Sequence, residues 1–165
     1  FVILSAHYRS EQNFSKDLLD SAWRSLDSLY GYLRGMKSST PSLNQTGEGY
    51  RALLDDLNTP MAISELHRIA KKMHSAQGIE QQTLQSELLG LAGLMGLLQQ
   101  DPESWFTHAR GSDDITKEEV EDMIAKRQQS KIDKDYAGAD EIRQALLDRG
   151  VVLEDSREGT TWRRN

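Results

Sequence analysis

Apolar residues recur at three- and four-residue steps through most of the first hundred positions, a spacing typical of amphipathic helices. The pattern predicts a helix over residues 1–8 and a second helix that Ser15 caps and that ends near Gly35. It also predicts a short helix over residues 50–57 and another over about residues 82–98. The first part of the chain is therefore expected to be a bundle of helices.

A loop and a strong helix start separate these segments. Residues 37–49 are rich in Ser, Thr, Pro and Gly, which favours a surface connection. Thr59 as N-cap, with Pro60 at the first helical position, predicts where the following helix begins. Its predicted buried face consists of Ile63, Leu66, Ile69, Ala70 and Met73.

Gly90, Gly93 and Gly96 interrupt the helical pattern of residues 82–98. Each glycine inside a helix costs about 1 kcal/mol relative to alanine. Three of them at three-residue spacing lead us to expect that the backbone of another helix approaches this one closely.

Residues 101–106 read as a turn or short helix that contains Trp105 and Phe106, and residues 111–114 read as a linker. We place the domain boundary there. The expected domains are a helical bundle over residues 1–110 and a smaller C-terminal domain over residues 115–165.

The C-terminal domain begins with Thr116 and Glu119 at the spacing of a capping box, and Ile115 and Val120 stand at the positions of a hydrophobic staple. A helix from Lys117 to about Lys131 follows from this. A second helix starts after Asp135, packs through Ala139, Ile142, Leu146 and Leu147, and stops at Gly150.

Two short strands, one through Val151 and Leu153 and one through residues 161–163, are expected to pair across a turn at residues 155–159. The predicted fold is thus mainly α: a helical bundle followed by a small α+β domain of two helices and a β-hairpin.

The charge is distributed unevenly along the 165 residues. The formal net charge is -6, but residues 1–125 contain 11 basic and 18 acidic residues, whereas residues 126–165 contain 9 and 8. Non-specific attraction to phosphates requires many cations. Any nucleic-acid contact in the C-terminal domain should therefore be local and directed at bases.

Several classes of protein are disfavoured. The chain has no cysteine, which excludes disulfides and thiolate zinc sites. It has no apolar run of the roughly 18 residues that a membrane helix needs and no signal peptide, so we expect a cytoplasmic protein without membrane contact. It shows no nucleophile triad, phosphate loop or paired carboxylates, so no catalytic residues are expected.

Histidine is the remaining candidate metal ligand, and it is poorly spaced for that role. Residues 67 and 74 are seven apart, which is too far for a zinc-binding pair on adjacent turns, and no carboxylate clearly converges on them. We expect no metal site at the four histidines, which are His7, His67, His74 and His108.

The last forty residues contain candidate base-contacting groups. Tyr136, Asp140 and Arg143 follow each other at spacings of four and three, which places them along one side of the second C-terminal helix. A phenol can stack on a base, a carboxylate can accept N–H groups, and a guanidinium can donate to base oxygens. Lys131 could reach the same place.

The hairpin adds Asp155 at the expected turn, together with Trp162 and Arg163. A simpler interpretation stands beside this one. An Asp and an Arg three residues apart are most often a solvated pair worth a few tenths of a kcal/mol, and Trp162 could fill the core of the hairpin or touch RNA.

Three strings resemble a known family, the cysteinyl-tRNA synthetases. They are LSAHYRSEQNFS (Leu4–Ser15), LLDDLNTPMAI (Leu53–Ile63) and KDYAGADEIRQALLDRGVVLEDSREGTTWRR (Lys134–Arg164). They occur in the order and spacing of the family, and the resemblance covers essentially the whole chain.

The resemblance implies that the chain is a C-terminal fragment, which also fits an apolar run at Phe1 without a preceding cap. It implies a bundle domain and an anticodon-binding domain that bind tRNA(Cys) at its GCA anticodon loop, as a monomer. The fragment alone would not be an enzyme and would need no cofactor. The parent enzyme, a cysteine–tRNA ligase, would use ATP and zinc through a catalytic domain upstream.

Carried over residue by residue, the anticodon-contacting aspartate of the family falls at Asp140, the following arginine at Arg143, and the acidic residue of the LED string at Asp155. Trp162 and Arg163 stand in the GTTWRR ending of the family. The chain departs from the family at two positions, with Lys131 where many members have arginine and Tyr136 where they have tryptophan. Lysine loses the bidentate fork of arginine, and tyrosine offers a smaller ring for stacking.

One alternative of another class remains at this point. The bundle and the hairpin could form a helical protein–protein interaction module without RNA binding, and the acidic net charge favours that reading slightly.

Overall fold

The fold is taken from a computed structural model that describes residues 1–107, 115–156 and 159–164. The chain divides into two compact units, Phe1–Pro102 and Glu103–Asn165, and each is considered by itself. The linker predicted at residues 111–114 lies outside the described residues.

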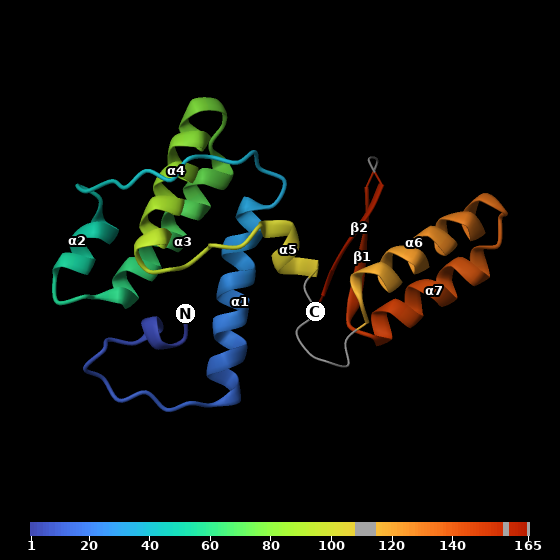
Figure 1. The fold of residues 1–165 in the computed structure, drawn as a ribbon, viewed down its shortest axis with the longest axis horizontal. Coiled ribbons are helices and arrows are strands. Elements are labelled where there is room, and N and C mark those ends of the chain that lie inside the picture. The colour runs from blue at the N-terminus through green and yellow to red at the C-terminus, as the bar shows by residue number, and fades with distance from the viewer. Residues whose placement is uncertain (108–114, 157–158, 165) are drawn as a thin grey trace. The chain divides into compact units, whose positions relative to one another are not determined.

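In chain order the elements (Figure 1) are η1 (Ile3–Ser5), α1 (Lys16–Leu33), α2 (Glu48–Leu54), α3 (Thr59–Ser75), α4 (Gly78–Leu94), α5 (Pro102–Thr107), α6 (Lys117–Ile132), α7 (Tyr136–Asp148), β1 (Val151–Ser156) and β2 (Gly159–Arg164). The mainly α fold class is confirmed.

Helix α3 is the centre of the first unit and contacts η1, α1, α2 and α4 (Figure 1). A helix surrounded in this way must be apolar over a wide stripe. The buried face predicted for α3 is confirmed, because Ile63, Leu66, Ile69, Ala70 and Met73 are all buried.

Helix α1 starts where the sequence predicted, since the Ser15 side chain accepts a hydrogen bond from the Leu18 N–H at 3.2 Å. Its packing is uneven. Leu29 and Tyr30, near its end, are buried, whereas Trp23 is 41% exposed. The broad apolar stripe expected for this helix therefore reaches the core only through its C-terminal half and Ala22.

The helix predicted over residues 1–8 is wrong, because the structure has only the three-residue 3-10 turn η1. The Ser5 hydroxyl donates to the Val2 carbonyl at 2.7 Å, and the next residue, Ala6, is extended. No residue of η1 is buried. A short helix without tertiary burial is unstable in water, so the apolar pattern alone does not maintain one here.

The start predicted for α3 is wrong by one residue. Asn58 is the N-cap, and its side-chain oxygen accepts a hydrogen bond from the Met61 N–H at 3.2 Å. Thr59 is already helical. Asparagine and threonine both cap well, so the sequence alone did not distinguish the two.

Gly90 and Gly96 near the end of α4 have separate explanations, nothing in the structure explains Gly93, and the expected close approach of another helix is wrong. A Cβ on Gly90 would collide with the backbone of Ser42 and Leu43, which belong to a loop. Among the described residues, and apart from the neighbouring backbone of α4 itself, no atom lies within 4 Å of such a Cβ on Gly93. Gly96 has a positive φ of 67° just after α4 ends at Leu94, where the left-handed region favours glycine.

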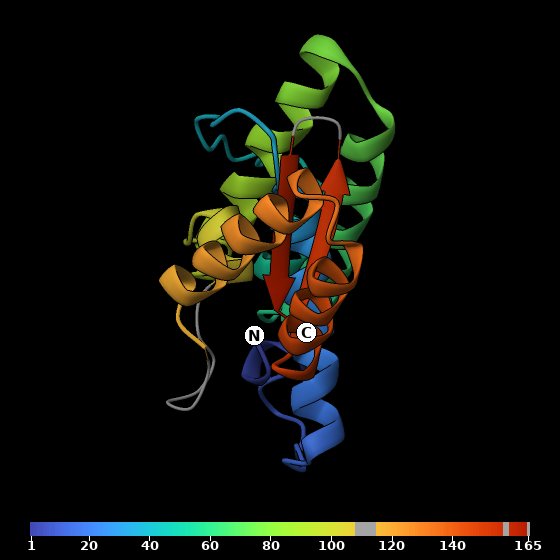
Figure 2. The same ribbon diagram turned by 90° about the vertical axis from the view of Figure 1, so that its right-hand side faces the viewer.

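The second unit contains the predicted two helices and hairpin. The capping box is confirmed, with the Glu119 N–H bonded to the Thr116 hydroxyl at 3.2 Å and the Thr116 N–H bonded to the Glu119 carboxylate at 2.9 Å. Asp135 caps α7 by accepting from the Gly138 N–H at 3.0 Å. Both helices lie on one side of the hairpin (Figure 2).

The hairpin is antiparallel, with Leu153 opposite Trp162 and Asp155 opposite Thr160. Asp155 therefore lies within β1. The prediction that Asp155 is part of the turn is wrong. The core between the hairpin and the helices consists of Ile115, Val120, Leu146, Val151, Leu153 and Trp162.

Candidate nucleic-acid interface

Two cations on α6 and one carboxylate on β1 form the centre of the candidate site. Arg127 and Lys131 are four residues apart on α6 and therefore lie on the same side of that helix. Asp155 follows Leu153 by two residues on β1, so it lies on the same sheet face as that core residue. The capped start of α6 and the hairpin register bring the three side chains together.

The contacts among these groups are close. Arg127 binds Asp155 through both ends of its fork, with Nη1 donating to Oδ1 at 3.0 Å and Nη2 donating to Oδ2 at 2.9 Å. The Thr160 hydroxyl donates to Oδ1 at 2.7 Å, and Lys131 Nζ donates to Oδ2 at 3.5 Å. The Arg127 side chain is 6% exposed, whereas those of Asp155 and Lys131 are 46% and 43% exposed.

These contacts determine the ionisation of the cluster. The hydrogen bonds from Arg127, and next those from Thr160, hold the pKa of Asp155 far below its ordinary value. The bond to Asp155 raises the pKa of Arg127, and the negative charge of Asp140 on α7 adds to that effect. Arg127 and Asp155 therefore both stay charged at neutral pH.

The cluster lines a hollow of about 400 Å³, whose walls are Ile124, Arg127, Gln128, Lys131, Asp155, Ser156, Gly159 and Thr160. Its size suits a flat group such as a nucleobase. The hollow combines a carboxylate and an ammonium group, which are an acceptor and a donor for base edges.

The predicted face of α7 is on the surface. Tyr136 is 65% exposed, and Asp140 and Arg143 are exposed as well. Asp140 influences Arg127 through its charge. Among the described residues, no hydrogen bond or ion pair joins Tyr136 or Arg143 to the cluster. The structure thus brings Lys131 and Asp155 into contact and leaves Tyr136, Asp140 and Arg143 exposed on α7.

Trp162 lies in the core and is 6% exposed. Its neighbour Arg164 is equally buried, lies 5.7 Å from the Trp162 ring and donates hydrogen bonds to the Thr107 and Ile115 carbonyls. This burial favours the supporting role for Trp162. A contact between its ring and RNA remains a prediction.

Arg163 lies on the other face of the hairpin from Asp155 and Trp162, because side chains alternate along a strand. Its Nε donates to Glu154 Oε1 at 3.0 Å. Arg163 can contact the same RNA as Lys131 only if the RNA passes around the edge of the hairpin.

Arg127 was missed by the sequence interpretation. Val120, Ile124 and Arg127 follow each other on α6 at spacings of four and three, which places a cation on the apolar side of the helix. Arginine is almost never buried without a partner. A charged residue at that position was therefore the signal for a partly buried ion pair with a distant carboxylate.

The first unit holds further polar clusters. His67 Nε2 lies 2.7 Å from the Ser25 hydroxyl, and burial lowers the pKa of this histidine. His7 and Arg9 both lie near the Asp56 carboxylate, at 3.7 Å and 3.2 Å. Within the described ranges, no group of three or more potential metal ligands is present. His108 lies outside those ranges.

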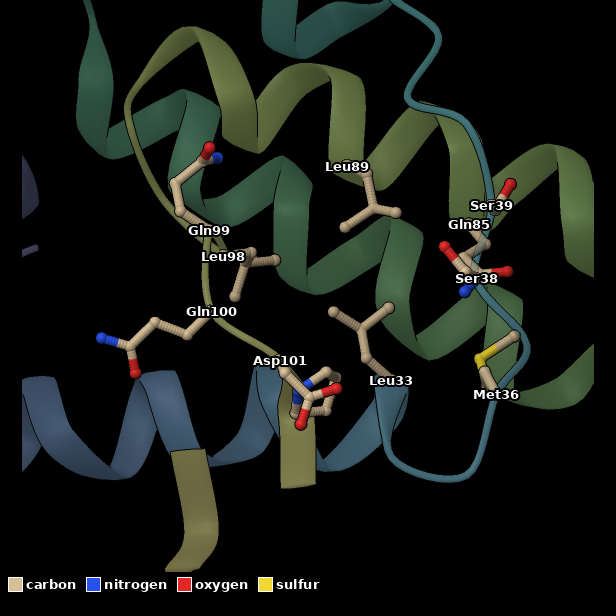
Figure 3. A pocket seen from close by; sticks show the side chains of 11 residues that line it. Leu33, Met36, Ser38, Ser39, Gln85, Leu89, Leu98, Gln99, Gln100 and Asp101 are labelled. Atoms are coloured by element: carbon tan, nitrogen blue, oxygen red, sulfur yellow. The ribbon is translucent and has the colours of Figure 1, made fainter. Parts of the chain in front are cut away.

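A hollow of about 310 Å³ lies beside the ends of α1 and α4 in the first unit. Figure 3 shows Leu33, Leu89 and Leu98 directed toward its middle, with Met36 and the serines of the following loop at one side. Its leucine lining contributes to the packing of the bundle. It contains no arrangement of nucleophile and base.

In the part of the chain that is described, no helix is both long and apolar enough to cross a lipid bilayer.

Two family models match the chain in the two units. A DALR domain model matches residues 50–99, and a model of the cysteinyl-tRNA ligase anticodon binding domain matches residues 113–163. The second match covers α6, α7 and the hairpin, and therefore the cluster around Asp155. Neither description is that of a protein-interaction module, so the alternative considered from the sequence has no support.

Curated relatives agree with these matches. A protein named cysteine–tRNA ligase from Saccharophagus degradans is 47% identical over 99% of the chain. Proteins of the same name from Rhodospirillum centenum and Xanthomonas campestris are 42% and 41% identical over 98% and 99% of it. The chain spans about 36% of the length of each of these relatives. With a DALR domain followed by a cysteinyl-tRNA ligase anticodon-binding domain, the chain belongs to the cysteine–tRNA ligase family.

Proposed function

We propose that the chain binds tRNA(Cys) and reads its GCA anticodon as part of a cysteine–tRNA ligase. The observation that carries the proposal is the hollow in which Lys131 and Asp155 lie in contact with each other. This hollow falls inside the segment that matches the anticodon-binding domain.

The exposed groups offer the interactions that unpaired bases require. The Tyr136 ring, at the first position of α7, is a stacking platform, and stacking on an aromatic ring is worth about 1–3 kcal/mol per base. Asp140 accepts N–H groups, and Arg143 and Lys131 donate to base or phosphate oxygens. The α7 face and the hollow together suit an anticodon loop whose bases are splayed apart.

The balanced charge of residues 126–165, with 9 basic and 8 acidic residues, supports base reading over phosphate binding. A protein that neutralises few phosphates releases few counterions. Binding should therefore depend only weakly on salt and strongly on the loop sequence.

In the whole ligase, the catalytic parts that activate cysteine with ATP, with the zinc site, would lie outside this chain, and the protein would act as a cytoplasmic monomer. Binding energy at the anticodon raises the rate of aminoacyl transfer only when it helps to align the distant acceptor end. The role of this chain is then to supply that energy for the correct tRNA alone.

The test compares Asp140→Ala with Glu141→Ala, a neighbouring carboxylate about 100° further round α7. The measurement is the kcat/KM of tRNA charging by the ligase that carries this chain, with adenylate formation measured in parallel. We expect Asp140→Ala to lose about 1–3 kcal/mol of transition-state binding while adenylate formation and the Glu141→Ala variant stay unchanged. Equal charging by Asp140→Ala and the unmodified ligase would remove Asp140 from the interface.

The base-reading character is tested separately, by fluorescence titration of the whole chain with a GCA stem-loop and with the same loop scrambled. Tighter binding of the GCA loop is expected. Equal binding of both loops would contradict anticodon reading.

A further inference from the structure

Arg127 combines an ion pair with a buried donor that has no partner, and stability alone does not require this combination. Its side chain is 6% exposed, and its Nε is buried with no hydrogen-bond partner among the described residues. A buried donor left unsatisfied costs about 1–3 kcal/mol. Replacing a buried ion pair with apolar residues of similar volume is often neutral or stabilising. The arginine therefore calls for a role beyond packing.

The carboxylate that Arg127 holds has nearly all its acceptor positions filled. A carboxylate offers about four lone-pair positions. Two on Oδ1 accept from Arg127 Nη1 and the Thr160 hydroxyl, and one on Oδ2 accepts from Arg127 Nη2. The remaining position, on Oδ2, has only the long 3.5 Å contact from Lys131 Nζ.

That last position is the one a ligand can take. Asp155 and Lys131 both line the hollow, and the Lys131 side chain is 43% exposed on a flexible stem, so it can leave Oδ2 at small cost. Arg127 and Thr160 cannot leave so easily, since their bonds are short and Arg127 is buried.

We propose that Arg127 is a positioning residue for base recognition, which orients the Asp155 carboxylate so that a nucleobase N–H group takes the Oδ2 position when Lys131 moves off it. The inference rests on the proposed function and names the group that the hollow recognises: a base donor, such as the amino group of cytosine, adenine or guanine. Lys131, once displaced, donates to a neighbouring base or phosphate oxygen.

The chemistry of the cluster makes this position selective. The hydrogen bonds from Arg127 and Thr160 keep the pKa of Asp155 low, so its carboxylate remains an acceptor only and cannot donate to a carbonyl. A base that places a carbonyl oxygen at Oδ2 would bring two acceptors together and be rejected.

The planar fork of arginine is required for this orientation. Two parallel bonds from one guanidinium hold a carboxylate in a single plane, whereas the single ammonium of lysine lets it rotate. Arg127→Lys retains the buried charge but loses the plane. The Arg127→Lys variant therefore distinguishes a positioning role of Arg127 from a purely electrostatic one.

The experiment is a fluorescence titration of the whole chain with four stem-loops. One carries the GCA loop, and in each of the others one base is replaced by an analogue without its amino group: inosine for guanosine, uridine for cytidine, or purine riboside for adenosine. The proteins are the unmodified chain, Arg127→Lys, Arg127→Met and, as the matched control, Arg149→Met, which removes an exposed arginine at the end of α7.

We expect the unmodified chain and Arg149→Met to bind at least one analogue about 10-fold more weakly than the GCA loop. In both Arg127 variants, the ratio of the Kd for that analogue to the Kd for the GCA loop should be close to one. The corresponding Kd ratios for the other two analogues should not change. A merely structural arginine would weaken binding of all four loops equally.

Unchanged ratios in a folded Arg127→Lys or Arg127→Met chain overturn the inference, as does an unmodified chain that discriminates against none of the analogues. If Arg127→Met does not fold, Arg127→Lys decides. If neither variant folds, Arg127 is structural and the inference fails. Failure of the proposed function is recognised separately, because the unmodified chain would then bind GCA and scrambled loops equally.

Discussion

The backbone of Ser42 lies directly against Gly90 of α4, in the space that a Cβ at residue 90 would occupy. The same stretch of loop is tied to α4 by a hydrogen bond from the Ser42 N–H to the Ser86 carbonyl at 2.8 Å. Gly90 is thus a glycine of close approach, and the approaching segment is a loop.

Gly90→Ala should destabilise the first unit by about 1–3 kcal/mol, because an inserted methyl group must push the loop backbone away. Gly93→Ala is the matched control on the same helix, where no described residue outside the neighbouring backbone of α4 comes within 4 Å of an added Cβ. Gly93→Ala should stabilise the first unit by up to about 1 kcal/mol, because alanine has a higher helix propensity than glycine. Urea unfolding of the two variants measures both changes, and a neutral Gly90→Ala would contradict the close approach.

The start of α3 gives a second paired prediction. Asn58→Ala removes the side chain that caps the helix and should cost about 1 kcal/mol. Thr59→Ala alters a residue already inside the helix and should change stability by less than about 0.5 kcal/mol. Thermal unfolding distinguishes them, and the reverse order would restore Thr59 as the cap.

Asp155 should give the chain an acid-sensitive stability. Its folded-state pKa is lower than the ordinary value of 3.8, so the paired carboxylate stabilises the fold above about pH 4, and the contribution is lost as the pH falls through the folded-state pKa. Asp155→Asn should cost about 1–2 kcal/mol at pH 7, less than a fully buried pair because the Asp155 side chain is 46% exposed.

The measurement is urea unfolding of the unmodified chain and of Asp155→Asn between pH 2 and pH 7. The difference between their free energies of unfolding should become smaller below about pH 4. Glu154→Gln is the control, since its partner Arg163 is on the solvent side and exposed pairs contribute about 0–1 kcal/mol. If the difference in free energy of unfolding stays constant with pH, the destabilisation by Asp155→Asn is not electrostatic.

Substitutions at Trp162 and Tyr136 should affect different properties. The change at Trp162 should lower stability, and the change at Tyr136 should lower affinity for RNA. Trp162→Ala removes a buried ring from the core and should cost about 3–5 kcal/mol of stability. Tyr136→Ala removes an exposed ring, so stability should change by less than about 0.5 kcal/mol, while affinity for the GCA stem-loop falls by about 1–3 kcal/mol. Thermal melts and titrations of both variants provide the check, and unaltered affinity in Tyr136→Ala would exclude it as a stacking platform.

Sequence patterns predicted best where a single local interaction decides the structure. Ser15, Thr116 and Asp135 cap the helices that follow them, because each cap joins residues three apart. The apolar run at residues 1–8 misled the prediction, since helical spacing without burial does not maintain a helix. The glycines of α4 misled it as well, since the sequence does not show which segment approaches Gly90.

The sequence by itself determined the family, the mainly α architecture, and the candidate contact residues Lys131, Tyr136, Asp140, Arg143 and Asp155, because these depend on short strings and on helical spacing. Only the tertiary structure decided that Asp155 is held by Arg127, 28 residues earlier in the chain, and that Trp162 lies in the core while Arg163 lies on the opposite sheet face. The reason is physical. A strand exposes alternate residues on opposite sides, so the partners of a carboxylate depend on the hairpin register and on the helix packed against it, and no local pattern contains that information.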